Sequence, residues 1–389
     1  MGALAGVTVV TLEHAIAAPL CTRQLADHGA RVIKIERPGV GDFARAYDER
    51  VAGLSSHFVW TNRSKESLTL DLKHAQAPQI LSRLLDRADV LVQNLAPGAA
   101  ARLGLSYEAL APKHPGLIVC DISGYGADGP YRDRKAYDLL IQAESGFLSV
   151  TGTPGEMAKA GCSIADIAAG MHAYGNILAA LIERARTGRG RSIDISMLES
   201  MVEWMGFPMY YAFDGAAPPP RAGAAHATIH PYGPFPTGDG ESVMLGVQNE
   251  REWQLFCSKV LGQPALASDE RFSANARRLE NREALHAIIV ARFASLTAEQ
   301  LGALLDDAQI ANARVNDMAQ VWAHPQLQAR GRWTTVATPA AVVPALLPPG
   351  MTEANMAPIP ALGEHSEAVL AELGYDAAQI AQFRQDGAV

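Results

Sequence analysis

The chain has 389 residues, of which 48% are hydrophobic and 19% charged, a balance typical of a globular protein with two or three domains. Its formal net charge of −8, without any run of Lys or Arg, argues against nucleic-acid binding and leaves room only for local basic pockets. The four cysteines are far apart and form no C-x-x-C pair, which indicates reduced thiols in a cytoplasmic protein and no zinc site. We expect no signal peptide, because no basic segment or cleavage site precedes the first strand-like run.

The first third of the chain alternates between short β-branched runs and helical patterns. The pattern predicts helices at 19–28 and 78–87 and strands at 7–13, 31–36, 67–72, 90–94 and 117–122. This alternation is typical of an α/β fold with a mostly parallel sheet and helices packed on its faces. Functional residues are then expected in the polar loops outside the carboxyl ends of the strands, after Glu13, Glu36, Leu72, Asn94 and Ile122.

A glycine-rich string at 124–129, GYGADG, satisfies the G-x-G-x-x-G pattern of dinucleotide-binding proteins. Pro130 follows it directly, and no helix opens within the glycine run, so the positive helix end that binds a pyrophosphate is missing. We interpret the string as a turn that delivers Lys135, Tyr137 and Asp138 to the edge of a site.

One carboxylate, Asp166, opens a helix made almost wholly of small and apolar residues. Ser163 precedes it by three residues, which is the S-x-x-D form of a capping box and predicts that Asp166 lies in the first helical turn. Backbone N–H groups and the helix dipole would keep this carboxylate ionised, the form that attacks an acyl carbon to make a mixed anhydride. An Asp at this position most often serves only as a cap, but the small residues at 168–170 leave room for a large substrate.

The same helix has the length of a membrane span over 164–182. It carries Asp166, His172 and Asn176, so we predict a buried helix and no membrane segment. After Gly188 the composition changes, and a Pro/Gly/Ala-rich linker is expected at 214–225. A second unit with a hairpin and amphipathic helices at 250–260 and 282–293 should follow, until another Pro-rich stretch at 337–350 leads to a helical tail.

Several motifs, in this order, resemble those of the family III CoA-transferases, also called the CaiB/BaiF type. They are IKIERPGVGD (33–42), LTLDLK (68–73), QNLAPGAAARLGL (93–105), GYGADGP (124–130), AYD (136–138), the DIAAG turn at Asp166, TGRGRSIDISM (187–197) and LGEHSEAVLAELG (362–374). The resemblance covers almost the whole chain, and an ordered set of motifs is more specific than any single one.

The resemblance implies a Rossmann-like large domain built from both chain ends and a small inserted domain, in an interlinked homodimer. The large domain would comprise residues 1–213 together with a returning tail at 351–389, and the small domain residues 226–336, with linkers at 214–225 and 337–350. Acyl-CoA, a small carboxylate and a second copy of the chain would be its partners.

The resemblance also implies a mechanism in which Asp166 attacks the thioester of a donor acyl-CoA. The resulting aspartyl anhydride is opened by the CoA thiolate to give an aspartyl-CoA thioester, which the acceptor carboxylate then opens. CoA is cosubstrate and carrier, and no metal or permanently bound cofactor is expected. Positions that match CoA contacts of the family are Ile16, Ala17, Arg37, Leu70, Lys73, Asn94, Leu95, Arg102 and Lys135, with Leu103 as further apolar surface.

Ile16 stands where the formyl-CoA-specific branch of the family has a Gln. Only the backbone around Ile16 and Ala17 can then serve near the thioester, which argues against formyl or oxalate specificity. Tyr137, followed by Asp138, resembles the transferases, whereas the related α-methylacyl-CoA racemases carry a His there. A phenol with a pKa near 10 is a poor base for an α-proton, so racemase activity is the weaker alternative. A CoA-binding regulatory module without catalysis is a third alternative, which the intact Asp166 turn disfavours.

The loop at 226–240 resembles that of members that transfer CoA between small dicarboxylates. We predict succinyl-CoA as donor and a C4 to C5 dicarboxylate such as itaconate, mesaconate or citramalate as acceptor, bound by His226, His230 and Tyr232. An equal alternative is that this loop is only the turn that enters the small domain. Intramolecular transfer between the two carboxylates of a mesaconyl skeleton would use the same residues.

Overall fold

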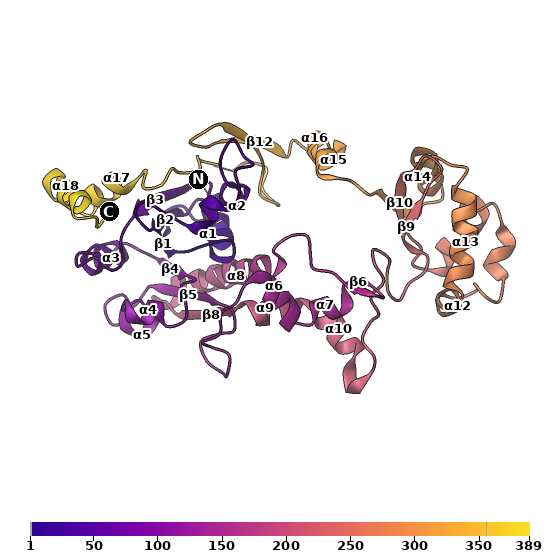
Figure 1. The fold of residues 1–389 in the computed structure, drawn as a ribbon, viewed down its shortest axis with the longest axis horizontal. Coiled ribbons are helices and arrows are strands. Elements are labelled where there is room, and N and C mark those ends of the chain that lie inside the picture. The colour runs from indigo at the N-terminus through magenta and orange to yellow at the C-terminus, as the bar shows by residue number, and fades with distance from the viewer. Residues whose placement is uncertain (1, 355) are drawn as a thin grey trace. The chain divides into compact units, whose positions relative to one another are not determined.

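The computed structural model describes residues 2–354 and 356–389. The chain forms two compact units, and we describe each by itself (Figure 1). Unit 1 comprises Met1–Gly146, Ala160–Gly206 and Gln326–Val389, and unit 2 comprises Phe147–Lys159 and Phe207–Pro325. Both ends of the chain therefore contribute to unit 1, and unit 2 is formed by two separate segments.

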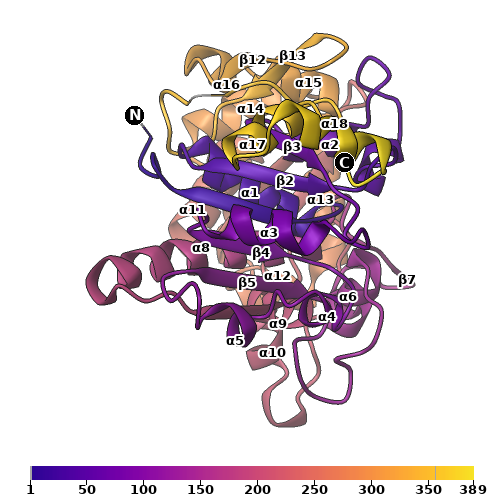
Figure 2. The ribbon, with the colours of Figure 1, turned by 90° about the vertical axis from the view of Figure 1, so that its left-hand side faces the viewer.

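A six-stranded, fully parallel sheet organises unit 1, as the alternating pattern predicted. Its strand order is β3-β2-β1-β4-β5-β8, and Figure 2 shows neighbouring strands side by side. The strands are β1 (Thr8–Leu12), β2 (Arg31–Glu36), β3 (Lys65–Thr69), β4 (Val90–Gln93), β5 (Ile118–Ser123) and β8 (Ser192–Ser196). Because all six run in one direction, the loops that follow them emerge at a single edge of the sheet.

Helices cover both faces of this sheet. On one face lie α3 (Ala77–Leu85), α17 (Ser366–Glu372) and α18 (Ala377–Gln385), and on the other lie α1 (Ala17–Asp27) and α8 (Ile164–Thr187) (Figure 1). Leu91 of the sheet shares a buried apolar core with Ile80, Leu370 and Phe383 of the first group, so the C-terminal helices pack on the N-terminal strands. Further elements of unit 1 are η1 (Phe43–Ala46), α2 (Ser56–Thr61), α4 (Ala99–Arg102), α5 (Tyr107–Leu110), α6 (Asp138–Glu144) and α9 (Met197–Trp204).

Unit 2 contains a three-stranded antiparallel sheet of order β11-β10-β9. The hairpin expected after the first linker is β9 (Tyr232–Pro236) and β10 (Ser242–Gly246), and β11 is Ala311–Arg314. Its core contains Trp253, Phe256 and Phe293. The last of these belongs to α13 (Arg282–Phe293), which begins and ends as predicted. The remaining elements are α7 (Phe147–Val150), β6 (Gly152–Thr153), β7 (Glu156–Met157), α10 (Gly206–Tyr211), η2 (Phe213–Gly215), α11 (Glu250–Leu255), η3 (Phe256–Val260), η4 (Pro264–Ser268), α12 (Asn275–Glu280), α14 (Ala298–Asp307) and α15 (Met318–Trp322).

The Pro-rich stretch expected to be a linker at 337–350 is instead largely a β-hairpin within unit 1. After α16 (Pro325–Ala329), strand β12 (Trp333–Ala337) pairs in antiparallel fashion with β13 (Val342–Leu346). Pro344 is tolerated because a two-stranded ladder leaves every second N–H outside the pairing. Pro content predicted a linker, but the β-branched alternation around it determined the structure.

Length and apolarity single out no individual helix among the described residues as able to cross a membrane. Only α13 and α14 together meet these two criteria, with a bend of 111° between them. All four cysteines are free thiols, and three of them, Cys21, Cys120 and Cys257, are buried.

Candidate functional site

Asp166 lies in the first turn of α8, as predicted, but the helix is capped by a different residue from the one expected. Ser163 makes no cap bond with its side chain, because its backbone (φ −76°, ψ 71°) departs from the extended geometry of a Ser cap. Instead, Oδ1 of Asp138 accepts hydrogen bonds from the N–H groups of Ala165 (2.7 Å) and Asp166 (3.3 Å). The other oxygen of Asp138 accepts from Gln142 at 2.7 Å.

The carboxyl group of Asp166 is half-buried and accepts no hydrogen bond from any residue that the structure describes. Burial, together with the negative charge of Asp138, raises the pKa of Asp166 to about 7. Burial and the neighbouring charge therefore oppose the ionised state that the helix end was expected to favour. Because Asp138 already occupies the helix N–H groups, they do not stabilise a charge on Asp166.

The second turn of α8, directly after Asp166, approaches the first turn of α1 closely. A Cβ atom on Gly170 would lie 2.7 Å from the carbonyl oxygen of Ala17, so only glycine allows this contact. Asp166 is one turn before Gly170 on the same face of α8 and therefore lies toward the start of α1. There the buried N–H groups of Ile16, Ala17 and Ala18 donate to no described protein atom.

The loop between β1 and α1 is held by two side chains from other parts of the sheet edge. Asn94 forms two bonds of 2.9 Å with the backbone of His14, one with the N–H and one with the carbonyl. Oδ1 of Asp42 accepts from the N–H of Ala15 at 3.1 Å, and Ala15 has a left-handed backbone with φ 61°. The side-chain amide of Asn94 was predicted to contact CoA, but it is already hydrogen-bonded to the protein through both its oxygen and its nitrogen.

A buried charge network lies around this loop. Lys34 contacts Asp42 at 2.7 Å and Glu13 at 3.5 Å, and Lys65 contacts Glu13 at 2.6 Å. Both lysines and both carboxylates are almost wholly buried, and Asn62 accepts a hydrogen bond from each lysine. Paired and hydrogen-bonded charges of this kind fix the geometry of the groups around them, whatever their net effect on stability.

An aromatic row that the sequence analysis missed leads from this loop toward Asp166. His14 stacks on Phe43 at 5.3 Å between ring centroids, Phe43 contacts Tyr47 at 5.7 Å, and Tyr47 contacts His57 at 5.2 Å. Burial, with the negative charges of Asp42 and Asp166, raises the pKa of Tyr47 to about 12, which places this phenol near the candidate nucleophile. The F-x-x-x-Y spacing directly after Asp42 was the available signal.

The remaining predicted positions of unit 1 differ in what they offer a ligand. Tyr137 is 69% exposed directly before α6. The side chains of Arg37, Lys73, Arg102 and Lys135 are also exposed, in loops or short turns after β2, β3, β4 and β5, and Leu95 is half-buried. Leu70 is only 1% exposed and belongs to the core, so its side chain presents no surface to a nucleotide. Among the described residues, no three His, Cys, Asp or Glu side chains are grouped to hold a metal ion.

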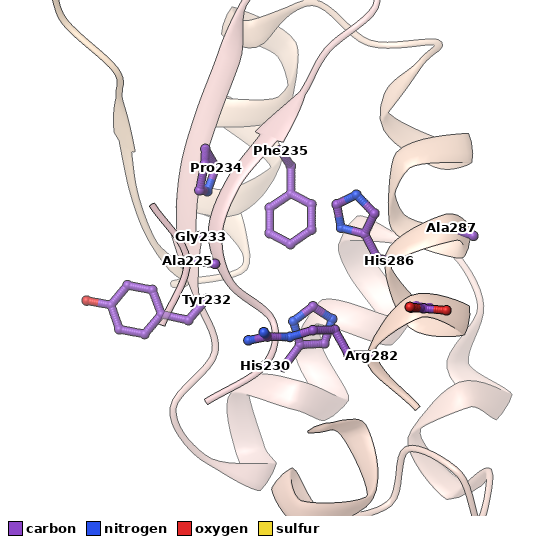
Figure 3. A pocket seen from close by; sticks show the side chains of 10 residues that line it. Ala225, His230, Tyr232, Gly233, Pro234, Phe235, Arg282, His286 and Ala287 are labelled. Atoms are coloured by element: carbon purple, nitrogen blue, oxygen red, sulfur yellow. The ribbon is translucent and has the colours of Figure 1, made fainter. Parts of the chain in front are cut away.

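Two of the three predicted substrate residues lie at a cavity of about 350 Å³ in unit 2 (Figure 3). His230 and Tyr232 line it, together with Phe235 and with Arg282 from α13. His226 does not line the cavity; its ring stacks on Tyr232, and its carbonyl accepts a bond of 2.7 Å from Arg282. The hairpin motif pointed to His230 and Tyr232, whereas Arg282 comes from α13, about 50 residues further along the chain, and no local signal in the sequence indicated it.

Two buried polar atoms of this cavity have no protein partner, Nε2 of His230 and Nε of Arg282. His230 is 4% exposed, and burial, together with the positive charge of Arg282, lowers the pKa of His230 to about 4, so its imidazole is neutral at pH 7. Figure 3 shows His230 and Arg282 close together, with the Tyr232 ring apart from them. Unpaired buried polar atoms of this kind are favourable partners for a polar ligand or for water.

The fold and the site together define an α/β enzyme whose candidate nucleophile is a carboxylate. A sequence model of CoA-transferase family III matches residues 4–366. The chain is 36% identical to a succinate–glutarate CoA-transferase of Agrobacterium fabrum, over 95% of each chain. It is 34% identical to a succinyl-CoA:mesaconate CoA-transferase of Haloarcula hispanica, over 96% of this chain and 97% of the other.

The solved structure of a CaiB/BaiF family protein from Brucella suis superimposes with a TM-score of 0.84 and 34% sequence identity, covering 96% of this chain and 99% of the other. The chain therefore belongs to CoA-transferase family III. It is a CoA-transferase, of a family that uses CoA thioesters as substrates.

Proposed function

We propose that this enzyme transfers CoA from succinyl-CoA to a C4 to C5 dicarboxylate through a covalent intermediate on Asp166. The observation that carries the proposal is a carboxylate without a protein partner, with a pKa of about 7, beside free N–H groups at the start of α1. A pKa near 7 leaves part of this carboxylate ionised at neutral pH, and the ionised form is the nucleophile. The relatives named for succinyl-CoA, glutarate and mesaconate support the choice of substrates.

In the first step, an oxygen of Asp166 attacks the thioester carbonyl of the donor, the C–S bond breaks, and the CoA thiolate leaves. The thiolate then attacks the Asp166 carbonyl of the anhydride, which releases succinate and forms an aspartyl-CoA thioester. The acceptor carboxylate repeats the sequence in reverse, so a new acyl-CoA forms and Asp166 is regenerated. Each tetrahedral intermediate carries an oxyanion, and the N–H groups of Ile16 and Ala17 are the donors we assign to it.

We infer that the cations at the carboxyl edge of the sheet bind the phosphates of CoA. Arg37, Lys73, Arg102 and Lys135 are exposed cations on long side chains, and Leu95 offers apolar surface. Tyr47 lies within electrostatic range of both Asp166 and Tyr137, and we assign the two tyrosines to shielding the acyl group from water. Leu70 and Asn94 act through their backbone, since the side chain of one is in the core and that of the other holds His14.

The acceptor we propose binds with one carboxylate in the cavity of unit 2. Arg282 supplies a guanidinium whose Nε–H has no protein partner, and neutral His230 supplies a further hydrogen-bonding nitrogen. Tyr232 and Phe235 form apolar walls that suit the short carbon chain of glutarate, itaconate, mesaconate or citramalate. His226 contributes indirectly, because its carbonyl holds the guanidinium of Arg282.

We also propose that the enzyme is a homodimer, with the two copies interlinked. Unit 1 exposes large apolar side chains on α6 and α8, namely Leu139, Leu140, Met171 and Ile182, which a second copy would cover. Light scattering after size-exclusion chromatography tests this: a mass of one chain contradicts it.

The experiment for the function is incubation of the purified enzyme with succinyl-CoA and a panel of carboxylates, with mass spectrometry of the products. The panel contains glutarate, itaconate, mesaconate, citramalate, malate, oxalate, formate and carnitine. A new thioester of a C5 dicarboxylate supports the proposal. Exchange of the α-hydrogen of a 2-methylacyl-CoA with deuterated water, without any transfer, supports a racemase instead.

Asp166→Ala tests the nucleophile, with Glu144→Gln as a control that alters an exposed carboxylate in α6. We expect Asp166→Ala to abolish transfer while CoA binding and the oligomeric state persist, and Glu144→Gln to behave as the wild type. In the wild type, trapping with hydroxylamine should convert Asp166 to a hydroxamate. Turnover by Asp166→Ala would place the nucleophile elsewhere.

A further inference from the structure

The loop from His14 to Ile16 contains a backbone conformation that its own sequence disfavours. Ala15 has φ 61°, in the left-handed region where the Cβ atom of an L-residue is crowded. It is one of only five non-glycine residues with positive φ among those described. Ala has no polar side chain with which to stabilise such a conformation locally, so a contact from elsewhere must hold it.

Asp42 provides that contact. Its Oδ1 accepts hydrogen bonds from the N–H groups of Ala15 (3.1 Å) and Ala44 (2.9 Å), and its Oδ2 accepts one from Lys34 (2.7 Å). The carboxylate is 1% exposed, so water does not compete for these bonds. Lys34 also contacts Asn62 and Glu13. These contacts fix the position of its ammonium group, and the ammonium group in turn orients the Asp42 carboxylate.

The peptide groups that follow Ala15 are those of Ile16 and Ala17, whose N–H groups point toward no described protein acceptor. A rotation about φ of Ala15 moves both N–H groups relative to the rest of the loop. His14, the residue before, is clamped by Asn94 through both of its backbone polar groups. The peptide group between His14 and Ala15 is therefore held at both ends, its carbonyl by Asn94 and its N–H by Asp42, and the direction of the two free N–H groups depends on its orientation and on φ of Ala15.

We propose that Asp42 is a positioning residue for CoA transfer: through Ala15, it aims the N–H groups of Ile16 and Ala17 at the oxyanion of the acyl group on Asp166. This inference rests on the proposed function, because it needs an acyl group on Asp166. Asp42 touches neither substrate nor reacting atoms in this assignment. Its part is to hold, before the substrate arrives, donors that would otherwise have to reorganise during the reaction.

The negative charge of Asp42 is essential to this role. All three of its partners are donors, two N–H groups and one ammonium. In Asp42→Asn the side chain has nearly the same shape, but its NH₂ group must face either Lys34 or the N–H groups of Ala15 and Ala44. Either arrangement places donor against donor, so the bond that holds Ala15 is weakened or lost.

The test is isotope exchange between succinyl-CoA and labelled succinate, which needs no knowledge of the natural acceptor. For Asp42→Asn we expect kcat to fall by about 30-fold, with the KM for succinyl-CoA changed by less than about 3-fold. The matched control is Asp27→Asn at the other end of α1, where Asp27 is 2% exposed and bonded by Arg63 through two 2.7 Å contacts. It also disrupts a buried charge pair, and we expect it to lower the Tm without this loss of kcat.

A second variant separates positioning from general destabilisation. Glycine adopts φ 61° at no steric cost, so Ala15→Gly in the Asp42→Asn background should restore kcat by about 5-fold or more, whether or not the Tm recovers. The inference is overturned if Asp42→Asn loses no more kcat than Asp27→Asn, or if Ala15→Gly restores nothing. The proposed function fails separately, if Asp166→Ala still catalyses the exchange.

Discussion

Asp138 caps the helix that begins just before Asp166, so the two carboxylates lie beside each other at one helix end. The cap bonds of Asp138, to the N–H groups of Ala165 and Asp166, consume the donors that would otherwise favour a charge on Asp166. The charge of Asp138 then adds to burial in raising the pKa of its neighbour. Asp138 therefore caps α8 and also raises the pKa of the candidate nucleophile.

Two substitutions of Asp138 separate these effects. Wild-type kcat/KM should rise with pH through about 7, because the ionised form of Asp166 attacks the thioester. Asp138→Asn keeps a cap oxygen but removes the charge, so the rise should occur about one pH unit lower, with little change in Tm. Asp138→Ala should shift the profile similarly and also lose about 1 kcal/mol of stability. The measurement is a pH–rate profile with urea unfolding; an unshifted profile in both variants would contradict the coupling.

The raised pKa of Asp166 also predicts how stability depends on pH. The folded chain holds the Asp166 proton up to about pH 7, whereas the unfolded chain releases it near the ordinary aspartate pKa of 3.8. Stability due to this group therefore falls as the pH rises from about 4 to 7 and is constant above that range. Asp166→Asn lacks this penalty and should be more stable than the wild type by about 1 to 3 kcal/mol at pH 8. Urea unfolding at several pH values checks this, and the difference should vanish near pH 4.

Gly170 and Gly175 offer a matched pair within α8. Alanine at Gly170 would place a Cβ atom 2.7 Å from the backbone oxygen of Ala17, so the two helices must separate. We expect a loss of about 1 to 3 kcal/mol and a fall in kcat, since the start of α1 moves away from Asp166. Gly175 is exposed with no atom near its Cβ position, so alanine there should stabilise the helix by about 0.5 to 1 kcal/mol. Equal effects of the two substitutions would contradict the close contact.

Arg282 tests the acceptor cavity. Arg282→Gln removes the guanidinium from beside His230 and should raise the acceptor KM by about 10- to 100-fold, with a smaller change in kcat. The KM for succinyl-CoA provides an internal comparison, and Arg277→Gln, an exposed arginine of α12 that pairs with Glu280, is the control. His226→Ala and His230→Ala should raise the acceptor KM as well. An unchanged acceptor KM in all three variants would mean that the cavity does not bind the acceptor.

Much of the fold could be predicted from the sequence, because the patterns that indicate helices and strands are local. The β-branched runs and helical patterns of the first third predicted five of the six parallel strands to within a few residues, and the ordered motifs indicated the family before any geometry was known. Failures occurred where two local signals competed. Pro-rich composition at 337–350 suggested a linker, whereas β-branched alternation made a hairpin.

The sequence by itself determined that a carboxylate stands in the first turn of a small-residue helix and that cationic loops follow the strands of a parallel sheet. Only the tertiary structure decided which residue caps that helix, where the pKa of Asp166 lies, and which side chain holds Ala15. Asp138 is 28 residues from Asp166, and Asp42 is 27 residues from Ala15. Periodicity reports the path of the chain, but hydrogen-bond partners, burial and neighbouring charge depend on which distant segments packing brings together.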